Sequence, residues 1–299
     1  MLGTFRTAVY LTFVVRKMAC MATVFAMALG FATAAIIPAK AQEPGQAGVA
    51  PPRDLSQIIT ERRLRVAFTS FDVPGFRKKL PDGSYAGPEA DLAKSLAKAL
   101  GVDLVYVDGG TTFNQLARTV ADLKADIGIN RMSASYDRVA YVRFSQPYAK
   151  LRHALVYNRD AVSRLAKGGK PEDAIRSFSG RVGAIAASSY VEFAMANFPR
   201  AKIVEVKSWD AGIKALRDKT IDVLYRDEFE VRRVLERNPD MGIDFGTAIL
   251  SDKVDLKVVY ICNTCGNLEQ FVNLYIENNR ELLARSMSVE ALLKNAREK

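Results

Sequence analysis

Residues 88–107 read PEADLAKSLAKALGVDLVYV, and this stretch decides the fold. Its apolar side chains fall three or four positions apart as far as Leu100, which predicts a helix with one buried face. Gly101 is typical of a helix end, and Val102–Val107 then reads as a strand. A strand is also expected at Leu64–Phe68, where apolar and polar residues alternate. Strand, helix and strand in this order build a mainly parallel sheet.

The alternation of strands and helices occurs twice along the chain. A helix within 113–124 and a buried strand at Ile127–Ile129 complete the first set. The second set begins with a strand at Val182–Ala186 and ends with one at Ile221–Tyr225. We therefore expect an α/β protein with two units, each a mainly parallel sheet flanked by helices. A length of 299 residues, at roughly 150 residues per domain, fits two units.

The first 41 residues differ in composition from the rest of the chain. Their only charges are four basic residues, and Met18–Pro38 is almost entirely small or apolar. This run precedes Ala39-Lys40-Ala41, so residues 1–41 resemble a secretory signal peptide cleaved after Ala41. An uncleaved membrane anchor is the alternative, because the run approaches the roughly 20 residues that cross a bilayer. Residues 42–59 are expected to form a flexible leader.

Composition excludes several function classes. The chain carries 43 Lys and Arg against 33 Asp and Glu, but the basic residues are spread out and no nucleic-acid-reading motif accompanies them. We expect no nucleic-acid partner. His153 is the single histidine, which leaves little room for a zinc site or for Ser-His or Cys-His catalysis. We expect no metal, no cofactor and no catalytic residue, and a packing or solvent role for His153.

Cys262 and Cys265 are the cysteines that remain after cleavage of residues 1–41. In an oxidising exported compartment, this C-x-x-C pair predicts a small structural disulfide. A redox-active pair would open a helix after a strand, whereas we expect a turn at Cys265–Asn267. A zinc site is not favoured, because the sequence shows no second pair of ligands to complete it. The structural disulfide is therefore the favoured interpretation.

Six short motifs occur in an order that resembles one protein family. Together they cover the chain from about Leu64 to Arg280. The motifs are Gly87-Pro-Glu-Ala-Asp91-Leu, Met132-Ser133-Ala-Ser135-Tyr-Asp-Arg138, Phe144-Ser-Gln-Pro-Tyr148, Ser179-Gly-Arg-Val-Gly183, Ile221-Asp222-Val-Leu-Tyr-Arg-Asp227 and Phe271-Val-Asn273. The chain resembles the bacterial extracellular solute-binding proteins of family 3, the periplasmic amino-acid-binding proteins of ABC transporters.

The resemblance implies a type II periplasmic-binding-protein fold with two lobes. Lobe 1 would be discontinuous, with residues 60–150 and 249–299, and lobe 2 would hold residues 151–248. Two crossovers, near 148–152 and 246–252, would form a hinge. The resemblance also implies a periplasmic monomer that binds a small-molecule ligand, an amino acid, by closing the hinge and that delivers it to an ABC permease in the inner membrane.

The two charges of an amino-acid ligand indicate which kinds of side chain should bind it. A buried amino-acid zwitterion requires an opposite charge at each end, because an unpaired buried charge costs several kcal/mol. Arg138 offers a planar guanidinium suited to a carboxylate, and Ser133 can add donors. Ser135 could cap a following helix whose amides favour an anion. The alternative is a surface ion pair of Arg138 with Asp137 or Glu89, and the resemblance favours ligand binding.

Asp227 follows the buried strand of the second unit, where ligands of open α/β sheets bind. The resemblance places the ligand ammonium there, although neighbouring Arg226 could instead satisfy this carboxylate. Ser188 and Ser189 stand at a predicted turn from strand to helix and could supply anion-binding groups. Ala187 occupies a position where the family usually has glycine, which leaves the geometry of this turn open.

Three further positions follow from the resemblance. Phe71 and Phe113 align with aromatic residues that sandwich the ligand in relatives, although isolated aromatics are often core. Arg131 stands where the family often has glycine. Its guanidinium could narrow the cleft, reach an acidic ligand side chain or point to solvent. We include all three residues among the expected ligand-binding positions.

Rival functions remain open at this stage. An exported enzyme on the same scaffold, similar to the cyclohexadienyl dehydratases, would need a carboxylic acid in the cleft, with Glu89, Glu192 and Glu228 as candidates. An accessory protein that binds a ligand other than an amino acid is a second rival, and a redox or sensor module a third. The expectation is a binding protein rather than an enzyme.

Overall fold

The computed structural model describes residues 53–166 and 177–298. The expected signal peptide, residues 1–41, and residues 42–52 of the expected leader lie outside the described residues. In the described part, the strands are β1 (Arg63–Phe68), β2 (Lys78–Lys79), β3 (Tyr85–Ala86), β4 (Asp103–Asp108), β5 (Ile127–Gly128), β6 (Val142–Asn158), β7 (Arg181–Ile185), β8 (Lys202–Val206), β9 (Val223–Asp227) and β10 (Phe245–Cys262).

Helices follow most of these strands. None of the helices in the described residues is long and apolar enough to cross a membrane. The described helices are α1 (Leu55–Thr60), α2 (Pro88–Leu100), α3 (Phe113–Ala121), α4 (Tyr136–Val139), α5 (Arg159–Ala166), α7 (Ser189–Asn197), α8 (Trp209–Arg217), α9 (Glu228–Arg237), the 3-10 helix η1 (Pro239–Gly242), α10 (Gly266–Asn278), α11 (Arg280–Ser286) and α12 (Val289–Arg297).

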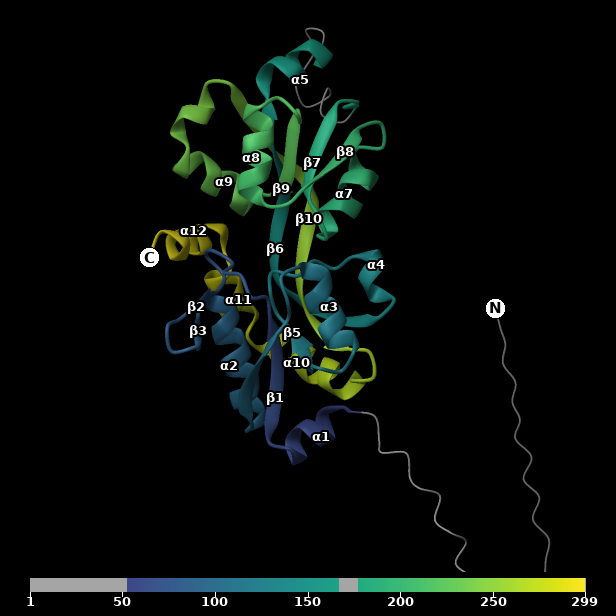
Figure 1. Ribbon diagram of the computed structural model, residues 1–299. Coiled ribbons are helices and arrows are strands. Elements are labelled where there is room, and N and C mark those ends of the chain that lie inside the picture. The colour runs from purple at the N-terminus through teal and green to yellow at the C-terminus, as the bar shows by residue number, and fades with distance from the viewer. Residues whose placement is uncertain (1–52, 167–176, 299) are drawn as a thin grey trace, which may run out of the picture. The chain divides into compact units, whose positions relative to one another are not determined.

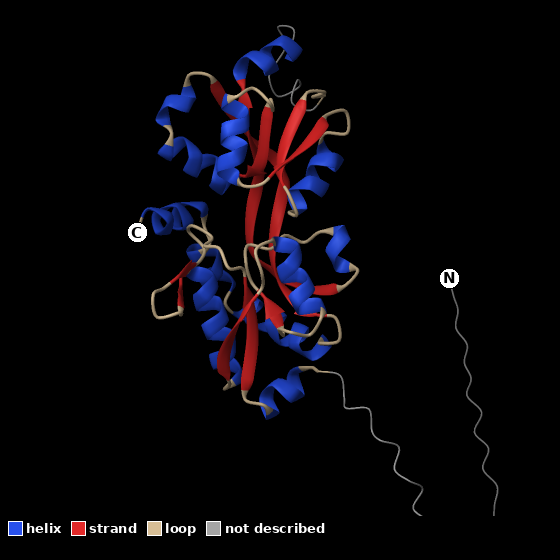
Figure 2. Ribbon diagram, viewed as in Figure 1, coloured by secondary structure: helices blue, strands red, loops and turns tan. Residues whose placement is uncertain are grey.

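Eight strands form one sheet in the order β4-β1-β5-β10-β6-β9-β7-β8. At one end β1 pairs in parallel with β4 and β5, and at the other end β7 pairs in parallel with β8 and β9. Helices lie on both faces of each parallel set (Figure 2). The predicted βαβ unit is confirmed, because α2 spans Pro88–Leu100 and ends at Gly101, whose left-handed φ of 67° suits glycine.

The long strands β6 and β10 join the two parallel sets (Figure 1). They pair with each other antiparallel along most of their length, and β10 also pairs with β5 while β6 pairs with β9. Their register shifts at three places, and the first shift, between Leu250 and Val254, overlaps the end of the second predicted crossover. Both crossovers are therefore continuous strands, and their action as a hinge stays a prediction.

Buried apolar side chains form separate clusters at the two ends of the sheet. One cluster contains residues of β1, α2, α3 and the C-terminal helices, while two smaller ones lie around β7, β9, α7 and α8. Phe229 of α9 belongs to the first cluster and packs edge-on against Phe76, with 5.4 Å between the ring centroids. The two predicted lobes therefore touch through side chains, although their boundaries stay predictions.

The expected leader is shorter than residues 42–59. The structure places α1 within this range, beginning at Leu55, because the Asp54 carboxylate accepts a hydrogen bond from Leu55 N and Ile58 is fully buried in the core. The prediction of a leader rested on the polar and small residues before this segment, and it did not recognise Asp54 as a capping residue. Residues 53–59 thus belong to the fold.

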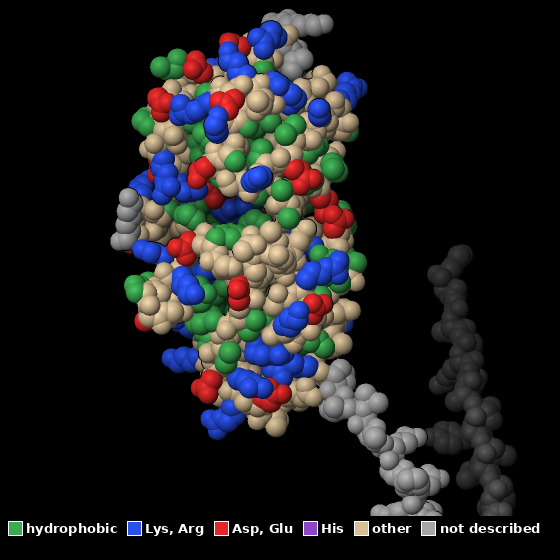
Figure 3. All heavy atoms as spheres, viewed as in Figure 1, with side chains coloured by type: hydrophobic (Ala, Val, Ile, Leu, Met, Phe, Trp, Pro, Cys, Tyr) green, Lys and Arg blue, Asp and Glu red, His purple; other side chains and the backbone are tan. Residues whose placement is uncertain are grey.

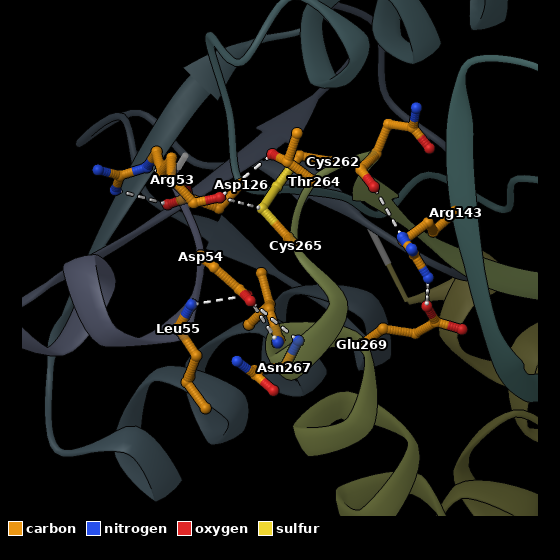
Figure 4. Close-up of a disulfide and its surroundings, with 12 residues drawn as sticks. Arg53, Asp54, Leu55, Asp126, Arg143, Cys262, Thr264, Cys265, Asn267 and Glu269 are labelled. Atoms are coloured by element: carbon orange, nitrogen blue, oxygen red, sulfur yellow. Dashed lines mark hydrogen bonds and ion pairs between the residues drawn. A yellow bond between two sulfur atoms is a disulfide. The ribbon is translucent and has the colours of Figure 1, made fainter. Parts of the chain in front are cut away.

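Cys262 and Cys265 form a disulfide at the junction of β10 and α10 (Figure 4). The expected turn at Cys265–Asn267 is wrong, because Cys265 is the N-cap residue of α10 and the helix begins at Gly266. The pair therefore does open a helix after a strand. Both side chains are fully buried, which restricts thiol exchange and keeps the structural role as the favoured one.

Candidate ligand-binding site

Arg138 lies in α4, is 3% exposed and connects the two predicted lobes. From lobe 1, Asn114 Oδ1 accepts from its Nη2 at 2.8 Å and Tyr260 OH contacts Nη1 at 3.1 Å. From lobe 2, Ser189 Oγ accepts from Nη1 at 2.8 Å and Ala187 O accepts from Nη2 at 3.2 Å. Every one of these partners is neutral.

Arg138 carries no ion pair within the described part of the chain, so the alternative pairing with Asp137 or Glu89 does not hold. A buried guanidinium without a counter-ion attracts an anion strongly, because little water is present to screen it. A cavity of about 890 Å³ opens beside it, lined among others by Asn114 and Ser188. Arg138 is thus placed to receive a carboxylate.

Ser133 and Ser135 lie differently from what we expected. The strand predicted at Ile127–Ile129 ends at Gly128, and Ser133 follows in a loop that bridges to Lys257. Ser133 Oγ donates to Asp255 Oδ2 at 3.0 Å, so its hydroxyl is already bonded. Ser135 occupies the N-cap position of α4 but forms no cap bond, and a four-residue helix is too short to concentrate amides for an anion.

The turn between β7 and α7 holds the other serine pair. Ala187 adopts a left-handed φ of 54°, the conformation that glycine would favour at this position. Ser188 is the N-cap of α7, and its Oγ accepts from Tyr190 N at 3.3 Å. Ser189 points its hydroxyl to Arg138 at 2.8 Å. The turn thus adopts the backbone conformation that glycine would allow, although alanine stands at this position. This conformation strains the backbone.

Asp227 is the last residue of β9 and the N-cap of α9. Its Oδ1 accepts from Glu230 N at 3.0 Å, whereas its buried Oδ2 has no hydrogen-bond partner among the described residues. Burial by itself would raise the pKa of Asp227, but Arg131, Arg226 and Lys257 lower it to about 2. The carboxylate is therefore ionised, with one oxygen available to a ligand cation.

Arg131 narrows the space between the predicted lobes. Its φ of 51° lies in the left-handed region, and its Nη1 contacts Glu230 Oε1 of α9 at 2.8 Å. Its guanidinium carbon lies 5.3 Å from the Phe76 ring and 5.8 Å from the Phe229 ring. Of the three possibilities named from the sequence, the structure favours the first, because the charge of Arg131 is already paired.

Phe71 and Phe113 are neighbours in lobe 1. Their rings meet edge to face, with centroids 5.7 Å apart, and Phe71 is 38% exposed. No contact with a ligand tests these two positions, so both stay predictions of the binding site. Tyr190, which the sequence did not single out, lies fully buried on the lobe 2 side.

Charged residues of two buried strands were missed from the sequence. Arg226 of β9 is buried, and so is the ion pair of Lys257 with Asp255 in β10. Asp255 Oδ2 also accepts from Tyr190 OH at 2.8 Å. The available signal was a charged residue inside an otherwise apolar strand segment, since such residues seldom lie in a core without a partner.

The surface between the two ends of the sheet is hollowed, and basic side chains are visible within the hollow (Figure 3). The described residues include buried cations and carboxylates from both predicted lobes: Arg131, Arg138, Arg226, Lys257, Asp227, Glu230 and Asp255. Residues 53–166 and 177–298 contain no group of three or more His, Cys, Asp or Glu side chains placed to hold a metal ion. The arrangement is suited to binding a small charged molecule.

Several known proteins are similar to this chain in sequence. Cyclohexadienyl dehydratase of Pseudomonas aeruginosa is 36% identical over 96 residues, 32% of this chain and 35% of that protein. A probable histidine-binding protein of Campylobacter jejuni is 22% identical over 160 residues, 54% of this chain and 59% of that protein. The matches thus span about a third to three fifths of these relatives' own lengths.

Solved structures share the fold. An amino acid ABC transporter substrate-binding protein from Streptococcus pneumoniae, bound to L-arginine, superposes with a TM-score of 0.63 and 23% identity, covering 82% of this chain and 100% of that one. The expected type II periplasmic-binding-protein fold is confirmed. The model of the bacterial extracellular solute-binding proteins, family 3, matches residues 64–227, more than half of the chain. The chain therefore belongs to the bacterial extracellular solute-binding proteins of family 3.

Proposed function

We propose that this chain is the periplasmic solute-binding component of an ABC uptake system and that it holds an amino acid between its two lobes. Arg138 binds the ligand carboxylate, together with the Ser188–Ser189 turn, and Asp227 binds the ammonium. Phe71 and Phe113 face the rest of the ligand. Residues 1–41 direct export and are cleaved from the mature protein, and the partner that receives the ligand is an ABC permease.

One observation carries this proposal. Arg138 is a buried cation with only neutral partners, and Asp227 is a buried carboxylate with one oxygen unbonded among the described residues. These are opposite charges, as a zwitterion requires, and they come from the two predicted lobes. A ligand that engages both stabilises the contact between the lobes and so favours the closed state.

The test is a thermal-shift screen of the exported protein, purified from the periplasm and freed of ligand by unfolding and refolding. Each common L-amino acid is added at 100 times its dissociation constant or more. A specific ligand then adds about 2.7 kcal/mol of stability, which raises the melting temperature by roughly 5–10 °C for a chain of this size.

Two variants and a control complete the screen. Arg138→Gln and Asp227→Asn remove one charge each, and asparagine can still cap α9, so both should abolish the shift without unfolding the protein. Arg285→Gln removes a charge from α11 at a side chain that is 73% exposed and should leave the shift intact. A folded protein that responds to no amino acid would contradict the proposal and favour a different ligand.

A second candidate function rests on Glu89. Of the three glutamates considered from the sequence, Glu228 is bound by Arg152 and Glu192 accepts from the exposed Tyr136 N. Glu89 is fully buried beside Arg131, and burial raises its pKa, although the bonds from Tyr148 OH and Arg131 N oppose this. A carboxyl that keeps its proton can protonate a leaving hydroxyl, as a dehydratase requires.

Turnover of prephenate by the purified protein tests this candidate. Glu89→Gln should remove the activity, and Glu192→Gln, which changes a half-buried glutamate, should retain it. Absence of any product from the wild-type protein, at a protein concentration that gives a full amino-acid shift, rejects the dehydratase function and leaves the binding function alone.

A further inference from the structure

Arg226 is a buried cation that nothing in the binding scheme above uses. It lies in β9, next to Asp227, and is 3% exposed. Its guanidinium carbon lies 4.7 Å from the centre of the Tyr190 ring and 5.7 Å from that of Phe113. These rings belong to different predicted lobes, so the guanidinium lies between the lobes, at the proposed ligand position.

The hydrogen-bonding capacity of Arg226 is unused. Its guanidinium donates no hydrogen bond within the described residues, and its buried Nε has no partner. The single ion pair found for it is long, with 3.7 Å between Nε and Asp227 Oδ2. Burial lowers the pKa of Arg226, and Arg131 lowers it further, whereas Asp227 and Glu230 oppose the shift. A guanidinium with five donors is costly to bury in this state.

The charges in the site do not balance. Arg131 shares Glu230 with Arg233, at 2.8 and 2.7 Å, and Lys257 is paired with Asp255. Among the described residues, Arg138, Asp227 and Arg226 have no ion pair shorter than 3.7 Å. An amino-acid backbone uses the first two, because its carboxylate and its ammonium carry one charge each. Arg226 is then a surplus positive charge.

We propose that Arg226 binds a second anionic group of the ligand, so that the site takes an acidic amino acid, one that carries a carboxylate on its side chain. This inference rests on the proposed function, because Arg138 and Asp227 must hold the backbone charges. The side-chain carboxylate supplies the hydrogen-bond acceptors that Arg226 lacks, and its negative charge offsets the charge of this guanidinium.

The same feature excludes cationic ligands. An arginine ligand would bring its guanidinium against Arg226 without a spare carboxylate to receive it, and like charges in a buried site cost several kcal/mol. L-arginine, the ligand in the structure of the Streptococcus pneumoniae protein, should therefore not bind to this chain.

Titration calorimetry with two matched pairs of ligands tests the inference. L-glutamate is compared with L-glutamine, and L-aspartate with L-asparagine, because each pair differs in charge and little in shape. A charge-assisted hydrogen bond contributes about 1.5–3 kcal/mol, so in the favoured pair the acid should bind roughly 10- to 100-fold more tightly than the amide. L-arginine should not bind detectably.

In Arg226→Gln, the ratio of the dissociation constants of the amide and the acid should fall to nearly one, and the amide should still bind. Arg200→Gln removes the same charge from an exposed position of lobe 2 and should keep the full preference. If the wild-type protein binds an amide or L-arginine at least as tightly as the acids, or if Arg226→Gln keeps the preference, the inference is wrong while the proposed function stands. If the folded protein binds no amino acid, both are wrong. Should Arg226→Gln fail to fold, the wild-type ratios decide alone.

Discussion

His153 is the only histidine of the chain and lies within a group of aromatic rings. The rings of Tyr190, Phe193 and Tyr225 have their centres 5.1–5.4 Å from the imidazole, and its Nδ1 contacts Tyr225 OH. Burial lowers the pKa of His153 to about 4, although Asp255 opposes the shift. The imidazole is therefore neutral in the folded protein at neutral pH, in a packing role as expected.

This pKa makes stability depend on pH in a defined window. The unfolded chain binds a proton at His153 below pH 6.5, whereas the folded chain does so only near pH 4. The free energy of unfolding should therefore fall by about 3 kcal/mol as the pH drops from 6.5 to 4, because each pKa unit contributes about 1.4 kcal/mol. Urea unfolding at several pH values measures the free energy of unfolding of the wild type and of His153→Gln. The difference between the two proteins isolates the contribution of His153.

The single histidine also gives a direct check. Its ring resonances can be assigned without ambiguity in an NMR titration, and they should show no change of protonation between pH 7.5 and 5.5. A midpoint near pH 6.5 would show that the ring is exposed to water. It would contradict the predicted fall in the free energy of unfolding between pH 6.5 and 4.

At the scale of secondary structure, Asp54 connects the first turns of two helices. Its Oδ1 accepts from Leu55 N at 2.7 Å and from Leu268 N at 3.0 Å, and its Oδ2 accepts from Asn267 N at 3.0 Å (Figure 4). One carboxylate thus caps both α1 and α10. It holds the start of the described chain against the disulfide-linked end of β10.

Asp54→Ala should lower the free energy of unfolding by about 1–2 kcal/mol, because substitution of a helix cap by alanine removes backbone hydrogen bonds that no other group replaces. Urea unfolding at pH 7 measures the change. Asp54→Asn keeps the acceptor at Oδ1 and should lose less. Equal stability of Asp54→Ala and the wild type would mean that water satisfies these amides equally well.

The disulfide stabilises the junction between β10 and α10 by limiting the unfolded chain. For a loop of four residues, the chain-entropy model gives about 2 kcal/mol, which corresponds to roughly 4–8 °C in melting temperature. The variant Cys262→Ser/Cys265→Ser should melt lower by that amount and still bind ligand. Loss of ligand binding in a folded double variant would instead assign the pair a functional role.

The element boundaries show how far local patterns reach. The spacing of apolar residues predicted α2 with its observed ends, because caps and glycine stops act over a few residues. The helix around residues 113–124 is shorter than predicted and ends at Ala121, and the strand predicted at Ile127–Ile129 ends one residue earlier, at Gly128.

At the scale of the whole molecule, contacts between the predicted lobes set the balance between open and closed forms. The pair Arg131–Glu230 is one such contact, and it is buried. Arg131→Gly suits the left-handed backbone and keeps the Arg131 amide that donates to Glu89, so it removes the side chain with little strain. The ligand-free variant should favour the open form.

Small-angle X-ray scattering measures this shift as a larger radius of gyration in ligand-free Arg131→Gly than in the wild type. Saturating ligand should bring both proteins to the same value, because the bound ligand then holds the lobes together. The double variant Arg131→Gly/Glu230→Gln should scatter like the single one. An unchanged radius would show that other contacts close the cleft.

The sequence by itself determined the alternation of strands and helices, the family and the positions of Arg138 and Asp227, because periodicity and short motifs are local properties. The tertiary structure alone decided which charges are compensated. Arg131 stood out in the sequence only as a departure from the family, and Arg226 and Lys257 read as ordinary basic residues. In the structure Arg131 pairs with Glu230 from the other predicted lobe and Lys257 pairs with Asp255 in the same strand, whereas Arg226 has no close carboxylate partner. Compensation depends on distances through space and on burial, and neither follows from spacing along the chain.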